Sequence, residues 1–194
     1  MRIASIVEGK GDAEAFPVLL RRILHDVCPR EHHDVLRPIR IPRSRLVRPG
    51  ELERAADLAS RMTGPGDAVV VLIDADDDRP QCLAPELLHR LTRRDRVYRV
   101  ILANREFEAW FLAAAKSLQG RRGLRDDITA PSNPEDIRDA KGWLREHSVS
   151  GSSYRPTADQ AALSGVLDLD LAMRAPSFAK LVRDIRSVTE GTAT

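Results

Sequence analysis

Residues 68–78 read Ala-Val-Val-Val-Leu-Ile-Asp-Ala-Asp-Asp-Asp, and this stretch decides the fold that we predict for the chain. Its first six residues are apolar and mostly β-branched, which is typical of a buried strand. Strands buried on both faces occur in parallel sheets that are covered by helices. The apolar run ends at Asp74 and continues into further acids, so this strand would deliver carboxylates to its carboxyl end.

A second apolar run, residues 3–7, ends in the same way and is followed by Glu8-Gly9-Lys10-Gly11-Asp12. In an open α/β sheet, ligands bind beyond the carboxyl ends of the parallel strands. We therefore expect four acids to converge at one end of the sheet: Glu8, Asp12, Asp74 and Asp76. Carboxylates gathered in one place repel one another unless a cation neutralises them, and hard oxygen ligands suit Mg²⁺ or Mn²⁺.

The order of the remaining segments predicts an α/β, Rossmann-like fold with a mostly parallel four-stranded sheet flanked by helices. We expect strands at 2–7, 35–41, 68–73 and 97–102, alternating with helices at 12–27, 51–62, 85–93 and 104–118. Asp12 would be the N-cap of the first helix and Asn104 that of the fourth. These elements make up a core of residues 1–119.

The last third of the chain is organised differently. Residues 120–134 are polar and rich in glycine and proline, which indicates a flexible loop. Residues 135–194 then contain four helical segments, which we expect to form a helical C-terminal appendage that packs on the core. Their predicted bounds are 135–147, 158–163, 167–173 and 177–188.

Composition narrows the class of protein. The chain has 194 residues, enough to bury a core, and its two cysteines are too few for a disulfide framework. It shows neither the pattern of a signal peptide nor an apolar run of roughly 20 residues, so we expect a cytoplasmic protein without a membrane span. The net charge is only +2, so total charge does not indicate a nucleic-acid binder.

The distribution of charge is more informative, because five arginines lie within twelve residues: Arg37, Arg40, Arg43, Arg45 and Arg48. This run overlaps or follows the second strand, so its loop would rise on the edge that carries the acids. Arginine suits phosphate recognition through its planar set of donors. We predict that the last four bind nucleic acid, with a solvated loop as the alternative.

The pair Asp74 and Asp76 can reach one ion if the backbone stays extended, because residues i and i+2 then point the same way. An ordinary acidic turn is the alternative. An EF-hand is excluded, because Arg79 stands where that loop needs glycine and Pro85 where it needs glutamate. At the first cluster, Gly9-Lys10-Gly11 lacks the glycine spacing of both Walker and dinucleotide-binding motifs.

Glu106 and Glu108 flank Phe107 in the fourth expected helix. Helical geometry places the two glutamates roughly 200° apart, so they would not both face one site. Glu106 lies nearer the strand end and is the better candidate for a further ligand. Phe107, Trp110 and Phe111 are expected to be core residues rather than a base-stacking platform.

These motifs resemble known families. Val7-Glu8-Gly9-x-x-Asp12, followed by a strand ending in Asp74-x-Asp76, resembles the Toprim domain of topoisomerases, primases and OLD-family nucleases. The stretch 106–112, with Tyr154, Asp159-Gln160 and Ser177-Phe178-x-x-Leu181, resembles the Toprim-like family filed as domain of unknown function 4276.

The resemblance implies roles for individual residues. Glu8 would be the catalytic acid/base or a metal ligand, Asp74 and Asp76 the magnesium-binding pair, and Asp12 a ligand of a second ion. Possible additional residues are Asp78, Glu106, Glu108 and Lys10. Toprim nucleases also place a basic residue near the scissile phosphate, and its candidates here are Lys10, Arg155 and Lys180.

The resemblance also implies a function: a Mg²⁺- or Mn²⁺-dependent nuclease acting on DNA or RNA, in a bacterial defence setting beside a partner ATPase. Water would be the nucleophile, because Tyr98 lies within a strand and Tyr154 in a late loop. The alternative is a non-catalytic adaptor or sensor that binds the ATPase. A homo-oligomer stays open.

Overall fold

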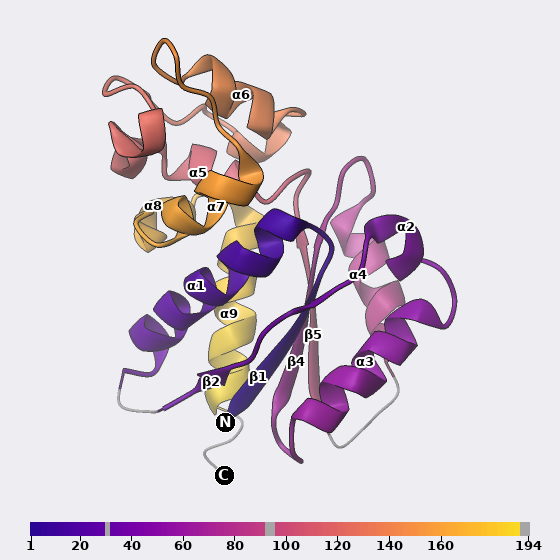
Figure 1. Ribbon diagram of the computed structural model, residues 1–194. Helices are drawn as coiled ribbons and strands as arrows, with labels where there is room; N and C mark the ends of the chain where they lie inside the picture. Colours follow the sequence, from indigo (N-terminus) through magenta and orange to yellow (C-terminus); the bar gives the residue numbers. More distant parts are fainter. Residues whose placement is uncertain (30–31, 92–95, 191–194) are drawn as a thin grey trace.

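The computed structural model of the chain describes residues 1–29, 32–91 and 96–190. Within them, a five-stranded sheet has the order β2–β1–β4–β5, and β3 pairs with β1 beyond the end of β2. All of these pairings are parallel, as Figure 1 shows. The strands are β1 (Arg2–Val7), β2 (Asp34–Val35), β3 (Ile39–Arg40), β4 (Ala68–Asp74) and β5 (Val97–Ala103).

Helices cover both faces of this sheet, and the strand sequences explain why. In β4, Ala68, Val70 and Leu72 contact one hydrophobic cluster, whereas the alternate residues Val69 and Val71 contact the other, as the two-residue period of a strand requires. One face packs against α1 (Lys10–Val27) and α9 (Pro176–Glu190), and the other against α3 (Glu51–Met62) and α4 (Pro80–His89). The uninterrupted apolar run of β4 therefore reflects burial on both sides.

The chain changes direction across the sheet between β1 and β4. From β1 it passes through α1 to β2 and β3 at one edge, and it later returns through α3 to β4 on the other side of β1. Val7 pairs with Leu72 and also with Arg40. Glu8 and Asp74 thus follow adjacent strand ends at the topological switch point, where open α/β sheets bind ligands.

The helices between residues 109 and 172 gather beyond the carboxyl ends of the strands, on the side of α1 (Figure 1). Their buried residues, including Leu144 and Leu163, belong to the same hydrophobic cluster as α1 and β1. Leu124 and Ile128 are buried in that cluster too, so the segment that we expected to be a flexible loop is anchored at two points. The elements are α5 (Ala109–Ala113), α6 (Ala140–Glu146), α7 (Pro156–Ser164), α8 (Leu169–Ala172) and the 3₁₀ turns η1 (Ala115–Leu118), η2 (Arg121–Gly123) and η3 (Pro134–Asp136).

Several expected boundaries were wrong. The strand at 35–41 is split into β2 and β3 around Pro38, which has no N–H to donate to a ladder. The arginine run contains a short helix, α2 (Arg43–Leu46), and α4 begins five residues before the predicted start. Residues 92 and 93 of that predicted helix lie outside the described part of the chain.

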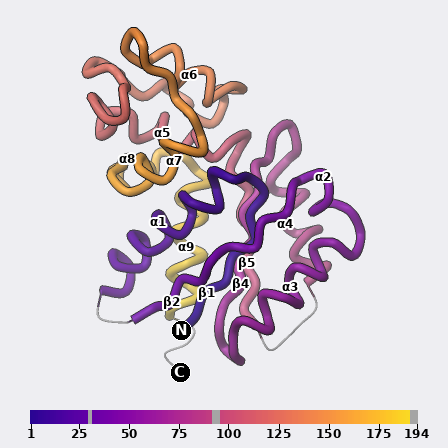
Figure 2. Tube along the Cα trace, in the orientation of Figure 1, coloured from indigo at the N-terminus to yellow at the C-terminus, as the bar shows by residue number. Residues whose placement is uncertain are grey.

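Figure 2 shows the start of β1 and the end of α9 at the end of the molecule opposite α6 and α7. In the residues that the structure describes, no helix is both long enough and apolar enough to span a bilayer.

Candidate active site

Glu8 is the first residue after β1, and its carboxylate is only partly satisfied. Its Oε2 is buried, accepts no hydrogen bond, and lies 3.9 Å from Nη1 of Arg43. The pKa of Glu8 is raised to about 7, chiefly by burial and also by the charges of Asp12 and Asp76, while Arg43 and Lys141 oppose the rise. A carboxylate in this state can exchange a proton near neutral pH.

Asp12 lies on the first turn of α1, and both of its oxygens are held. Its Oδ2 accepts a hydrogen bond from the Gly9 amide at 2.8 Å, and its Oδ1 accepts one from Nε2 of Gln160 at 2.7 Å. Gly9, not Asp12, is therefore the N-cap residue. The contact with α7 also requires Gly11, because a Cβ there would lie 1.9 Å from Oε1 of Gln160.

Asp74 ends β4 and turns inward. Its Oδ1 accepts a hydrogen bond from the Phe107 amide at 2.8 Å, and its Oδ2 lies 3.7 Å from Nζ of Lys141. Burial raises the pKa of Asp74 well above its usual value, and the charges of Asp12, Glu108 and Glu8 raise it further. Two of the acids predicted to surround one site, Glu8 and Asp12, are therefore close enough to Asp74 to act on its ionisation.

Asp76 does not follow Asp74 in extended conformation. Its backbone adopts φ +50°, its amide donates to the Arg105 carbonyl at 2.9 Å, and its exposed carboxylate lies 3.4 Å from Nε of Arg43. The expectation that the two aspartates point the same way fails, because this left-handed residue turns the chain at the end of the strand. Asp78 also pairs with Arg43.

A lysine that the sequence patterns did not single out, Lys141 at the start of α6, lies among these acids. Its Nζ lies 2.7 Å from Glu106, 3.2 Å from Glu108 and 3.7 Å from Asp74. Burial alone would lower the pKa of Lys141, but Glu108 and Asp74 outweigh burial and raise it. The available signals were weak: Lys141 is one of four lysines in the chain, and it follows Asp139, whose side chain caps α6.

Glu106 and Glu108 face the same cation, contrary to the helical argument. The chain does not form a helix between Asn104 and Glu108: Arg105 has φ +61° and α5 begins only at Ala109. Glu108 is almost fully buried, and its Oε1 accepts a hydrogen bond from the Tyr154 hydroxyl at 2.9 Å. Burial raises the pKa of Glu108, and Lys141 opposes that rise.

The other predictions for this segment had mixed outcomes. Asn104 caps no helix; its side chain instead donates to Glu135 at 3.1 Å. The expectation that Phe107, Trp110 and Phe111 belong to the core is confirmed, because all three are buried.

The arginine run divides into separate roles. Arg43 reaches the acids and donates to the Asp74 carbonyl, whereas Arg45 pairs with Glu51 and Arg48 is exposed on the loop after α2. Arg40 is exposed at the end of β3, beside α1. Arg43 is thus the member of the predicted set that pairs with the acids of the site in the described structure.

Within the described residues, none of the three earlier candidates for the basic residue forms an ion pair with Glu8, Asp12 or Asp74. Lys10 is exposed at the start of α1, and Arg155 directly precedes α7. Lys180 pairs with Asp184 on α9 and donates to the Val100 carbonyl at 3.3 Å.

Two cations, Arg43 and Lys141, thus lie among the acids. In the described ranges, no three Asp, Glu, His or Cys side chains are arranged to hold a metal ion together. The donors that are present are carboxylates, the type that Mg²⁺ and Mn²⁺ prefer, and Oε2 of Glu8 is buried without a hydrogen bond. The type of donor therefore suits such an ion, whereas the described side chains are not gathered in threes around one point.

Comparison with known families assigns the chain. Residues 7–186 match a family described as a domain of unknown function, DUF4276. The chain belongs to the DUF4276 family. The match includes Glu8, Asp74, Glu108 and Lys141, so the whole site lies within the region that defines this DUF4276 protein. No curated protein and no solved structure gives a significant match.

Proposed function

We propose that this DUF4276 protein is a divalent-metal-dependent nuclease of Toprim type, which hydrolyses phosphodiester bonds in DNA or RNA. The observation that carries the proposal is the position of Glu8 and Asp74 at the ends of adjacent parallel strands, at the switch point of the sheet. Glu8 directly follows β1, Asp74 is the last residue of β4, and both side chains are largely buried. A relation to Toprim domains is supported by the spacing Glu8-x-x-x-Asp12 and Asp74-x-Asp76. Partly desolvated carboxylates at such an edge favour a reactive site.

Glu8, Asp12 and Asp74 are the residues that would hold Mg²⁺ or Mn²⁺. The Asp76 carboxylate would become a further ligand if its ion pair with Arg43 were broken. When bound, such an ion neutralises charge on a phosphate and lowers the pKa of a bound water. In the metal-free protein the pKa of Glu8 is about 7, so Glu8 suits the role of proton acceptor at neutral pH where Asp12 and Asp74 alone hold the ion.

Lys141 and Arg43 would supply positive charge to the phosphate. Lys141 is held in place by Glu106 and Glu108, and a positioned cation stabilises the charge that develops on a phosphoryl group. Tyr154 serves a different purpose. Its hydroxyl donates to Glu108, and burial together with Glu108 raises its pKa, so it is a poor nucleophile and water is the better one.

Cleavage assays test the proposal directly. Labelled single- and double-stranded DNA and RNA are incubated with the protein in Mn²⁺ or Mg²⁺, with EDTA as the blank. We expect metal-dependent cleavage by the wild type, a loss of at least about 100-fold in Glu8→Gln and Asp74→Asn, and normal cleavage by Asp170→Asn, an exposed site on α8. A wild type that cleaves none of the four substrates, alone or with a partner ATPase, contradicts the proposal.

A second candidate is a non-catalytic adaptor or sensor that binds a partner ATPase. It is favoured by the contacts of Arg43 and Lys141, which already compensate the acids without a metal. Asp74→Ala distinguishes the two candidates in cells. If this variant folds and still binds the partner but loses biological activity, the adaptor function is excluded. If the variant retains biological activity, the nuclease function is excluded.

A further inference from the structure

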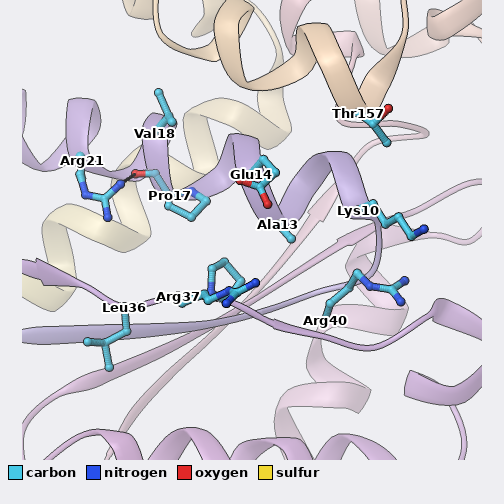
Figure 3. Close-up of a pocket in the computed structure, with 11 residues that line it drawn as sticks. Lys10, Ala13, Glu14, Pro17, Val18, Arg21, Leu36, Arg37, Arg40 and Thr157 are labelled. Carbon is cyan, nitrogen blue, oxygen red and sulfur yellow. Dashed lines mark hydrogen bonds between the residues drawn. The ribbon is translucent and has the colours of Figure 1, made fainter.

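A second feature begins near the carboxyl edge, at Lys10, two residues after Glu8. A groove of about 780 Å³ separates α1 from the segment that contains β2 and β3. The α1 wall is a single stripe from Lys10 through Glu14 and Pro17 to Arg21, and Figure 3 shows these side chains facing Arg37 and Arg40 across the groove. At 1.5 Å per residue, the stripe is roughly 16 Å long.

The groove is strongly basic. Four of its lining residues are cations, and Glu14 is the one acid among them. Lys10, Arg37 and Arg40 are exposed, and in the described part of the chain no ion pair or side-chain hydrogen bond engages them. Arg21 is held by the carbonyls of Pro17 at 3.4 Å and Val35 at 3.1 Å. Three cations are therefore available to an anionic ligand.

One end of the groove opens at the acidic site. Lys10 is two residues beyond Glu8 in the chain, and Arg40 pairs in register with Val7, the last residue of β1. Figure 3 places Lys10 and Arg40 together at one end and Arg21 toward the other. An anion that lies along the groove would thus reach the acids at its Lys10 end.

The lining also indicates which part of a ligand the groove recognises. It contains no aromatic residue; its apolar members include Leu36, Pro38 and Val18. Bases bind proteins without sequence preference largely by stacking on aromatic rings, and that contact is missing here. Arginine and lysine, by contrast, bind phosphates.

We propose that this groove binds the sugar–phosphate backbone of a single-stranded nucleic-acid segment and directs it toward Glu8 and Asp74. The claim that the strand is directed toward Glu8 and Asp74 rests on the proposed function, whereas the claim that the groove binds the strand does not. A volume of about 780 Å³ lies in the range of small-ligand pockets, which suits a few nucleotides of one strand rather than a duplex. Binding should be independent of base sequence and strongly dependent on salt.

Fluorescence anisotropy with a labelled 12-nucleotide DNA or RNA strand in EDTA tests the groove without cleavage. The test variant is Arg37→Gln with Arg40→Gln, and the matched control is Arg61→Gln with Arg186→Gln, two exposed arginines on α3 and α9 that give the same change in net charge. Each phosphate contact on a single strand contributes about 0.7 to the slope of log K against log salt. We expect the slope to become shallower by about 1.4 in the test variant and to stay unchanged in the control.

Equal losses in the two double variants would overturn the proposal, as would binding of the matching duplex as tight as that of the single strand. The groove and the nuclease fail separately. If the wild type cleaves with Mn²⁺ but the groove variant binds and cleaves normally, the groove is wrong and the nuclease stands. If the groove variant loses binding but no protein cleaves, the groove stands and the proposed function is wrong.

Discussion

Individual residues at the carboxyl edge are held in unfavourable electrostatic states, and Glu8 shows this most clearly. Its side chain ionises less readily in the fold than in the unfolded chain, because burial raises its pKa from 4.5 to about 7. The folded protein therefore binds this proton more tightly, and the contribution of Glu8 to the free energy of unfolding falls as pH rises from about 4.5 to about 7. A raised carboxyl pKa of this kind costs stability at neutral pH and is typical of functional sites.

Glu8→Gln should accordingly stabilise the metal-free protein in a pH-dependent way. At pH 8 we expect the variant to be more stable than the wild type by up to about 3 kcal/mol, at 1.36 kcal/mol per pKa unit. At pH 4 the difference should nearly vanish, because Glu8 is then largely protonated in both the folded and the unfolded chain. Urea unfolding in EDTA at both pH values measures it, with exposed Glu14→Gln as control. A difference that is the same at both pH values would contradict the assigned pKa.

Lys141 should contribute to stability through the acids that it neutralises. In Lys141→Met, the buried Glu108 carboxylate loses its cation, so we expect a loss of roughly 3 kcal/mol in the free energy of unfolding. Adding Glu108→Gln should restore part of that loss. Lys180→Met is the matched control, because its partner Asp184 is a helical neighbour at i+4 and such pairs contribute only about 0.5 kcal/mol. Equal losses in the two lysine variants would contradict the role given to Lys141.

At the scale of elements, the site depends on how α1 approaches α7. The two helices meet where Gly11 leaves space for Gln160, and this contact also holds Asp12 in place. Asp12 is thus positioned by Gln160, a residue that lies 148 positions further along the chain.

Gly11→Ala tests this contact. Alanine favours a helix by about 1 kcal/mol over glycine, but its Cβ would displace the Gln160 side chain from Asp12. We expect the lost hydrogen bond and the crowding to prevail, with a net destabilisation of about 1–2 kcal/mol. Gly64→Ala is the control, because a Cβ there would meet nothing nearer than Oδ2 of Asp67 at 3.5 Å, an ordinary van der Waals contact. The prediction fails if Gly11→Ala is as stable as the wild type by thermal unfolding.

The elements also show what sequence patterns can and cannot predict. β4 and α3 were predictable, because one is a continuous apolar run and the other has a clear apolar face. The turn at 104–108 was not predictable from the sequence. Its residues favour a helix locally, but the carboxylate of Asp74 at the end of β4 accepts a hydrogen bond from the Phe107 amide. Tertiary contacts of this kind override local propensity.

The same distinction applies to the candidate site. The acids Glu8 and Asp74 were predictable from their place at strand ends, since parallel strands bring their carboxyl ends to one edge. Lys141 was not, because it reaches the acids from a helix 67 positions after Asp74 and carries no local pattern. The basic groove was missed for a similar reason: Lys10 and Arg21 come from α1, and Arg37 comes from the opposite wall.

At the scale of the whole molecule, the fold brings acids, two cations and a basic groove to one edge of the sheet. The central claim is that this edge binds a divalent cation through Glu8 and Asp74. Binding to the native state alone stabilises it by RT ln(1 + [L]/Kd), so the melting temperature should rise with metal concentration. Replacing Asp74 should remove the binding of the cation. It should also remove part of the repulsion between carboxylates that destabilises the metal-free protein.

Thermal unfolding with increasing Mn²⁺ tests this claim most directly. In EDTA we expect Asp74→Asn, alone or with Asp76→Asn, to melt above the wild type. Millimolar Mn²⁺ should raise the melting temperature of the wild type and of Asp170→Asn, and leave Asp74→Asn unchanged. A wild type whose melting temperature does not respond to Mn²⁺, or an equal response in Asp74→Asn, would contradict the metal site and the nuclease proposed from it.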